Sequence, residues 1–341
     1  MRAVPSLTTA LGALLLAACG GGGGGSGEPE PLPPTASITS GNQAAVARAA
    51  LDGSDVLTGP SGATGDRTLV QSLPAGARPL GVVSSGLRRV MGAGDAPRRR
   101  VQRSAGLAVT QLPPEACLYS GSITTTVNDA DNNGVLSAGD GMTLTFNQCR
   151  DSAEAVATGA MAYTVTAIIA DTETRFAYSA TVAFQQFGVA VGDASASVNG
   201  SVSFAFDLTT SAAGFSYTIG SDSLVVTNAA PGIVESVVYN PGMRLAVGET
   251  FSPLASALSV DGTFEASSIG GRVAVATAQP MTWRGADLHP SSGQMVVTGA
   301  GGSRVRMTAV DASLVQLELD ANGDGTYEGS TVIAWSTLRT R

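Results

Sequence analysis

The segment from Asp129 to Asp140 carries oxygen-bearing residues at a spacing that suits a metal ion. The six that would supply ligands are Asp129, Asp131, Asn133, Val135 through its backbone carbonyl, Ser137 and Asp140. Gly134 stands among them, where a sharp turn is needed. Calcium prefers several hard oxygen ligands arranged around such a turn. The spacing predicts a calcium site, although a polar hairpin turn without an ion has the same composition.

A second acidic segment repeats part of this pattern. Its ligand-type residues are Asp320, Asn322, Asp324 and Glu328, with Gly325 at the turn. Thr331 replaces the acid that would end the loop, so we expect this second site to be weaker. No nucleophile, acid or base is recognisable beside either loop. Any calcium bound there would therefore be structural.

The first loop resembles the twelve-residue calcium loops of EF-hands and dockerins. It departs from them at Asp140, which is shorter than the usual bidentate glutamate and implies weak affinity. The residues on either side, 123–127 and 142–146, alternate between apolar and polar, as do 314–319 and 327–335 around the second loop. We therefore expect both loops to join strands and not helices.

The N-terminus has the pattern of an export signal. Arg2 precedes an apolar run from Leu11 to Leu16, and small residues follow up to Cys19. A cysteine at the cleavage point resembles the lipobox of bacterial lipoproteins. The resemblance implies that residues 1–18 are removed and that Cys19 becomes the lipidated first residue. Since Gly20, and not an aspartate, follows Cys19, it also implies an outer-membrane destination.

Residues 19–39 form a Gly/Pro-rich tether, and in an exported chain the two remaining cysteines are expected to pair. A disulfide between Cys117 and Cys149 would close a loop of roughly 33 residues and add about 3–4 kcal/mol of stability. It would also bracket the first acidic loop. The pairing is a second prediction that depends on export.

The composition excludes several kinds of catalysis. All 19 basic residues are arginine, which rules out Schiff-base chemistry and a Walker-type phosphate loop. His289 is the one histidine, and its His-Pro context predicts a solvated, inert side chain. The chain is therefore expected not to be an enzyme, with a carboxylate-dependent hydrolase as a remote alternative. A net charge of -8 disfavours nucleic acid as a partner.

Residues 40–116 are predicted to be helical or irregular. The alanine-rich run 39–52 favours one helix, capped by Thr39 or Ser40 and docked on the following sheet. Six arginines cluster further on, at Arg88, Arg89, Arg98, Arg99, Arg100 and Arg103. They suit anionic lipid or lipopolysaccharide, or else form a solvated loop.

Residues 117–341 alternate between apolar and small polar residues with a period of two. Turn signals separate the runs, at Asn199-Gly200, Pro231-Gly232, Pro241-Gly242, Asp261-Gly262 and Ser292-Gly293. The pattern predicts a mainly β protein, an antiparallel meander that forms a sandwich or an open curved barrel. Trp335 lies in an apolar run and is expected in the core.

The order of these segments resembles a loose group of proteobacterial lipoproteins of unknown function, which share the lipobox, a short helix, a cysteine-bracketed Asp/Asn loop and a β meander. The resemblance implies no activity. We expect an outer-membrane-anchored lipoprotein with a non-catalytic structural or binding role, stabilised by calcium. The alternative is a periplasmic carrier of lipid or lipopeptide. Envelope lipid, lipopolysaccharide or glycan are candidate ligands, while the protein partner, the oligomeric state and the side of the membrane stay open.

Overall fold

The computed structural model describes residues 34–58, 109–150, 153–172, 174–209, 214–251, 253–285 and 287–339. Cys19, the predicted export signal, most of the predicted tether and the arginine cluster at 88–103 lie outside these residues. Among the residues that are described, no helix is both long enough and apolar enough to cross a membrane.

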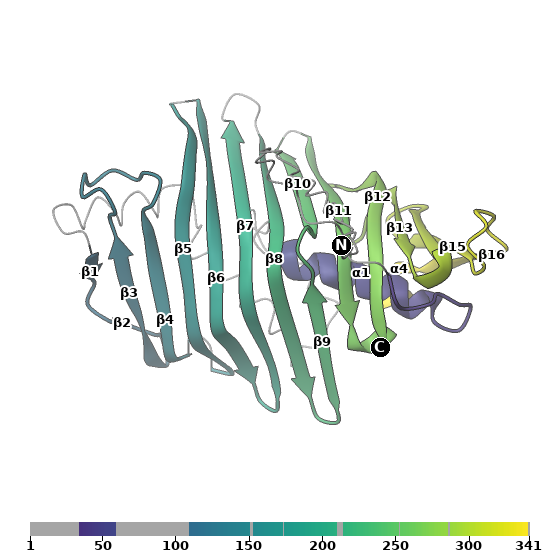
Figure 1. Cartoon of the computed structure of the whole chain (residues 1–341), viewed down its shortest axis with the longest axis horizontal. Coiled ribbons are helices and arrows are strands. Elements are labelled where there is room, and N and C mark those ends of the chain that lie inside the picture. The colour runs from purple at the N-terminus through teal and green to yellow at the C-terminus, as the bar shows by residue number, and fades with distance from the viewer. Residues whose placement is uncertain are drawn as a thin grey trace, which may run out of the picture.

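One continuous antiparallel sheet of sixteen strands forms the body of the protein (Figure 1). Its strands are β1 (Val109–Gln111), β2 (Glu115–Ala116), β3 (Ser120–Asn128), β4 (Gly141–Arg150), β5 (Ala155–Asp171), β6 (Arg175–Val191), β7 (Ala194–Thr209), β8 (Gly214–Ala230), β9 (Ile233–Tyr239), β10 (Arg244–Phe251), β11 (Leu254–Ala266), β12 (Gly271–Arg284), β13 (Ser292–Thr298), β14 (Arg304–Ala309), β15 (Leu314–Asp320) and β16 (Gly329–Ala334). Apart from β2 and β9, the strands follow one another across the sheet in sequence order. The predicted β meander is confirmed, as a single curved sheet and not as two stacked sheets. The sheet begins at Val109, before the boundary that the sequence suggests at Cys117.

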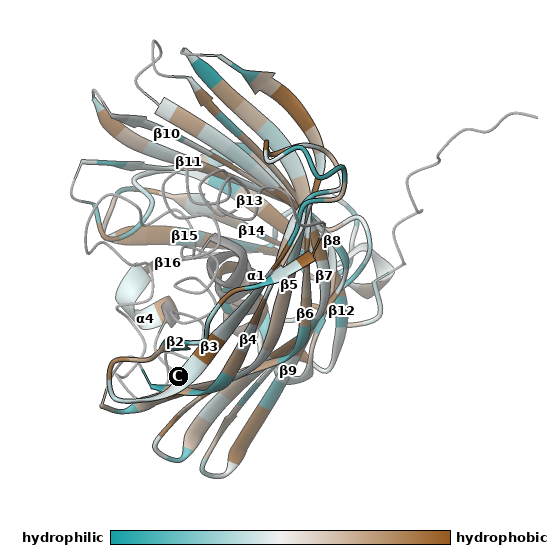
Figure 2. Cartoon of the chain, turned by 90° about the vertical axis from the view of Figure 1, so that its left-hand side faces the viewer, coloured by the Kyte–Doolittle hydropathy of each residue, from teal (hydrophilic) through white to brown (hydrophobic). Residues whose placement is uncertain are grey.

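Alternate residues of each strand face a common core. In β13, β14 and β15 the buried positions are Met295 and Val297, Val305 and Met307, and Val315 and Leu317. The alternate positions between them carry mostly polar or charged side chains, such as Gln294, Arg306 and Glu318. Because only one face is apolar, the sheet curves around what covers that face. Figure 2 shows this curvature, with helix α1 (Gln43–Thr58) on the inner side.

Helix α1 packs on the C-terminal half of the sheet, as the sequence predicts. Val46, Ala47 and Ala50 are buried against the core. The helix begins at Gln43, later than the predicted start, because Asn42 and not Thr39 or Ser40 provides the cap carbonyl for Val46 N–H (2.9 Å). Its neighbour is the short helix α4 (Trp335–Arg339), whose buried Trp335 donates to Asp311 O (3.1 Å). Trp335 lies in the core as expected, although in a helix and not in a strand.

Two short strands, β9 and β10, lie end to end between β8 and β11. β8 pairs with β10 through Gly214–Gly220 and with β9 through Leu224–Ala230. The turn between β9 and β10 contains Pro241-Gly242, which confirms that turn signal. Gly262 of β11 lies so close to this turn that a Cβ atom there would collide with Met243.

Three other Gly-containing pairs do not form turns, contrary to the prediction. Asn199-Gly200, Asp261-Gly262 and Ser292-Gly293 lie inside β7, β11 and β13. Gly200 has a φ of 111° beside a register shift between β7 and β8, and a Cβ atom would collide with Ser223 O. Glycine is needed at these positions because the chain bulges there and continues the strand.

The predicted disulfide joins Cys117 and Cys149, whose Cα atoms are 5.5 Å apart. Cys117 precedes β3, and Cys149 is the second-last residue of β4. The disulfide therefore closes the open end of the β3–β4 hairpin, opposite the acidic loop. It crosslinks the hairpin at the first edge of the sheet.

One acidic residue faces the apolar side of the sheet. Glu249 of β10 is 7% exposed, and its cross-strand neighbours on this face are Phe215 of β8 and Ser256 of β11. Burial disfavours the charged carboxylate and raises the pKa of Glu249 from 4.5 to about 7. Ionisation of this residue therefore opposes folding near neutral pH.

We expect the free energy of unfolding to fall by up to about 3 kcal/mol as the pH rises from 4.5 through 7, because Glu249 ionises first in the unfolded chain. Glu249→Gln removes this dependence and stabilises the protein at pH 8. Urea unfolding at several pH values and constant calcium measures both effects. Glu154→Gln, at an exposed position, serves as the control. An unchanged pH profile in Glu249→Gln would contradict the assignment.

Candidate metal centre

The first acidic loop joins β3 to β4 and is anchored on the next strand. Gly139 N–H donates to Val165 O, and Val165 N–H donates to Asp140 O, both at 2.8 Å. These bonds hold the end of the loop against β5. The alternating residues on either side form strands, as the sequence predicts, so this is a hairpin loop and not a helix–loop–helix.

Asp129 organises the first half of this loop from a fully buried position. Its two carboxylate oxygens accept the N–H groups of Asn133 (3.1 Å) and Gly134 (2.8 Å). Asn132 and Gly134 adopt left-handed conformations, with φ of 56° and 71°. Asparagine and glycine tolerate this conformation better than other residues, which explains their presence in the turn.

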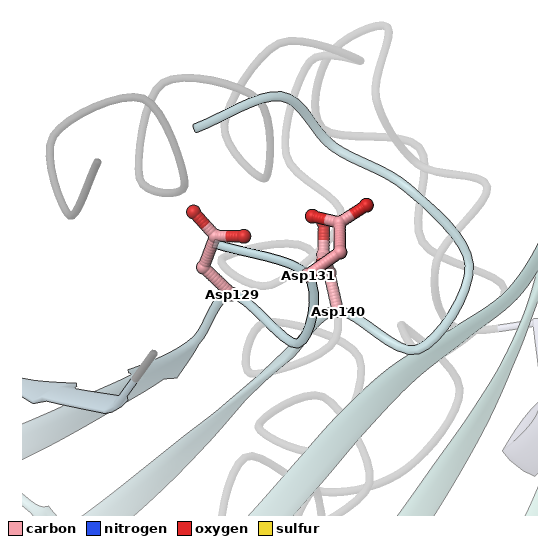
Figure 3. A group of neighbouring side chains, drawn as sticks. All are labelled: Asp129, Asp131 and Asp140. Carbon is pink, nitrogen blue, oxygen red and sulfur yellow. The ribbon is translucent and has the colours of Figure 1, made fainter. Parts of the chain in front are cut away.

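Asp140 is also fully buried and closes the loop by reaching back to its start. Its carboxylate accepts Ala130 N–H (2.8 Å) and Ser137 N–H (2.7 Å). Ser137 Oγ lies 3.0 Å from an oxygen of Asp131. Oxygen atoms of Asp129, Asp131 and Asp140 consequently lie within 4.8 Å of one another. Figure 3 shows these three side chains on the β3–β4 connection.

The second acidic loop joins β15 to β16 and is built in the same way. Asp320 is fully buried and accepts the N–H groups of Gly323 (2.7 Å) and Gly325 (2.9 Å). Glu328 accepts Ala321 N–H (3.1 Å). One oxygen each of Asp320, Asp324 and Glu328 lies within 4.8 Å of the others.

The equivalence of the two loops extends to their middle residues. Asn133 Nδ2 donates to Asp131 in the first loop (2.7 Å), and Asn322 Nδ2 donates to Asp324 in the second (3.1 Å). The third residue of the loop is therefore an aspartate and the fifth an asparagine in the first loop, and the reverse in the second. In the second loop, Thr326 N–H and the Asn322 side chain lower the pKa of Asp324 below 3.8, which favours its ionised form.

The two loops differ in the residue that closes them. Asp140 is the twelfth residue of the first loop, whereas Glu328 is the ninth residue of the second, and both accept the N–H group of the second residue. The longer glutamate side chain replaces the missing acid at Thr331, which lies inside β16. The sequence pattern identifies Glu328 as a ligand but does not reveal this equivalence, because it requires the folded path of the loop.

The donor set fits calcium chemically. Each loop gathers three carboxylates and an asparagine, all with hard oxygen atoms. Ion pairs between described residues include Arg175–Asp207, Arg272–Glu265 and Arg306–Glu318, and none of these three involves a loop acid. Backbone N–H groups also satisfy the buried acids by themselves. A cation site and an ion-free polar turn therefore share this framework.

His289, which the sequence also singles out, lies away from both loops. His289 is half-buried and stacks on Trp335, with ring centroids 6.0 Å apart, so the expectation of a solvated side chain is wrong. Val135, expected to bind metal through its carbonyl, has an exposed side chain. The acidic clusters found among the described residues are those of the two loops.

Without any metal, we expect Asp320→Ala to cost about 1–3 kcal/mol of stability, because the N–H groups of Gly323 and Gly325 lose the buried carboxylate that holds the loop together. Asp324→Ala is the matched control in the same loop. Since Asp324 is exposed and water replaces its hydrogen bonds, we expect this control to unfold almost like the parent protein. Urea unfolding in a chelator measures both. Equal costs would contradict the framework role of Asp320.

The comparisons with known proteins add no family to this geometry. No family model, no curated protein and no solved structure matches the chain.

Proposed function

We propose that this chain is an exported lipoprotein, held at the outer membrane through Cys19, with a non-catalytic structural or binding role in the cell envelope. The export-type N-terminus and the lipobox-like Cys19 support the anchor. The disulfide between Cys117 and Cys149 supports an oxidising compartment outside the cytoplasm. The tether places the folded body at a distance from the lipid.

The two acidic loops hold structural calcium ions in this proposal. The observation that carries it is the gathering of three carboxylates within 4.8 Å in each loop, with no arginine paired to them among the described residues. Mutual repulsion between such carboxylates is relieved by a divalent cation. Asp131, Asn133, Ser137 and the Val135 carbonyl would complete the first site, and Asn322 the second.

A non-catalytic role accounts for how the acids are used. Asp129, Asp140 and Asp320 are buried and accept backbone N–H groups, so they maintain loop structure. A hydrolase needs a carboxylate that is free to exchange a proton with substrate. This favours the structural role over the hydrolase alternative.

The outer face has two open depressions where a ligand could bind. Two depressions of about 560 Å³ and 440 Å³ lie along β7, β8 and β10. Their linings include Ser203, Thr218, Ser216 and Thr250, which belong to the face opposite the core. Apolar atoms nevertheless make up most of the accessible surface of both linings. A glycan and a lipid or lipopeptide therefore both stay candidate ligands of this surface.

We expect calcium to bind and stabilise the protein. With Cys19→Ala to prevent lipidation, calorimetric titration should give two binding events, and a hundredfold excess over Kd should add about 2.7 kcal/mol of stability per site. Asp129→Ala/Asp131→Ala should remove one event, and Asp320→Ala/Asp324→Ala the other. Neither heat nor a change in melting temperature in the parent protein would reduce both loops to ion-free turns.

We expect the anchor to depend on one sulfur atom. In a bacterial host the chain should incorporate labelled palmitate and sediment with outer membranes, because acyl chains add membrane affinity with every buried methylene. Cys19→Ser should abolish the label and release the chain in soluble form. Cys117→Ser/Cys149→Ser controls for loss of other cysteines and should keep the label. Equal labelling of Cys19→Ser and the parent would overturn the anchor.

A further inference from the structure

Among the residues that the structure describes, β16 is the last strand of the sheet, and one of its edges pairs with no other strand. It pairs with β15 and is the end of the strand order. Its sequence, Gly329–Ala334, contains no charge and no proline, and Ser330, Thr331 and Val332 are exposed. Exposed edges normally carry charges, prolines or bulges that block further pairing. β16 has neither a charged residue nor a proline within its length.

The register defines which backbone groups of β16 point away from the sheet. Trp335 N–H donates to Ser313 O (3.0 Å), in line with the pairing of Ala334 with Leu314. Hydrogen-bonded residues alternate along an antiparallel pair. Ser330, Val332 and Ala334 therefore direct their N–H and C=O groups outward. These three residues present a free ladder centred on Val332.

The first edge of the sheet is protected against such pairing. β1 and β2 are short strands that both pair with β3, and Pro113 and Pro114 lie between them. Proline lacks the N–H group that a ladder needs. A β16 strand from another molecule consequently finds no comparable ladder there. This disfavours head-to-tail filaments and leaves a symmetric contact between two β16 edges.

We propose that β16 pairs antiparallel with β16 of a second copy of this chain, about a two-fold axis through Val332. The free ladder is self-complementary in this register, because Ser330 faces Ala334 of the partner and Val332 faces Val332 of the partner. All three pairs exchange backbone hydrogen bonds. The outward side chains are uncharged, so no like charges meet across the axis.

The contact is small, which makes it concentration-dependent. A single short strand pair buries less than the roughly 1,000 Å² that a stable interface needs. We therefore expect a Kd between about 10 µM and 1 mM in solution. Anchoring both copies to one membrane raises their effective concentration and favours the pair. This inference stands on the strand geometry and not on calcium binding.

Sedimentation equilibrium of the full chain, in density-matched detergent, tests the proposal. Between about 10 µM and 1 mM the mass should rise from monomer toward dimer. Val332→Lys and Val332→Glu should each weaken association at least about tenfold, because like charges then meet at the axis. An equimolar mixture of the two variants should associate again, since the lysine of one copy faces the glutamate of the other only in the proposed register. An exposure of 54% at Val332 makes both changes compatible with folding.

The same changes at Val234 provide the matched control. Val234 is 71% exposed at the tip of the β8–β9 hairpin, away from β16. Val234→Lys and Val234→Glu should each dimerise like the parent. A parent chain that stays monomeric at about 1 mM would overturn the proposal. Failure of the mixed Val332 variants to associate, or equal weakening by the Val234 variants, would also overturn it.

Discussion

The burial of one face of a single sheet is the constraint on which the rest of the structure depends. Sixteen strands share this face, and residues such as Val305, Met307 and Leu317 are removed from water only if it is covered. A sheet with one apolar side satisfies this by curving, and α1 and α4 fill part of the inner side (Figure 2). The bulge at Gly200, and the break between β9 and β10 where they lie end to end beside β8, allow long strands to follow the curve without turning their apolar residues outward.

A curved sheet that does not close has two ends, and the chain concentrates its local crosslinks there. The β3–β4 hairpin has a disulfide at one end and the Asp129–Asp140 loop at the other. The β15–β16 hairpin has the Asp320–Glu328 loop. Inner strands are held by ladders on both sides, whereas outer hairpins have fewer partners. The two loops thus reinforce the part of the sheet that frays most easily, whether hydrogen bonds alone or bound ions hold them.

Local patterns in the sequence were sufficient for the parts of the fold that depend on neighbours. Period-two alternation predicts the strands, and the Asp/Asn/Gly spacing predicts that both acidic segments are hairpin loops. The pattern fails where long-range pairing decides, because Asn199-Gly200 is identical to a turn signal but lies opposite Val225 and Leu224 in a paired strand. Glu328 is a similar case: only the path of the backbone brings its longer side chain to the N–H group that Asp140 reaches in the first loop. The buried setting of Glu249 also depends on long-range pairing, because β8, which contributes Phe215, is next to β10 in the sheet but is separated from it by β9 in the sequence.

The attachment of the N-terminal segment to the far end of the chain has a consequence for the order of folding. Thr35 and Ala36 bond to Arg272 and Ala300, and Ile38 N–H donates to Ser303 Oγ (2.9 Å). These contacts join the start of the described chain to strands that are synthesised last. Contacts of such sequence separation form slowly, and they cannot form at all on an incomplete chain. α1 and the segment before it therefore dock only after the C-terminal strands have been made, whereas successive hairpins such as β3–β4 and β5–β6 can pair earlier.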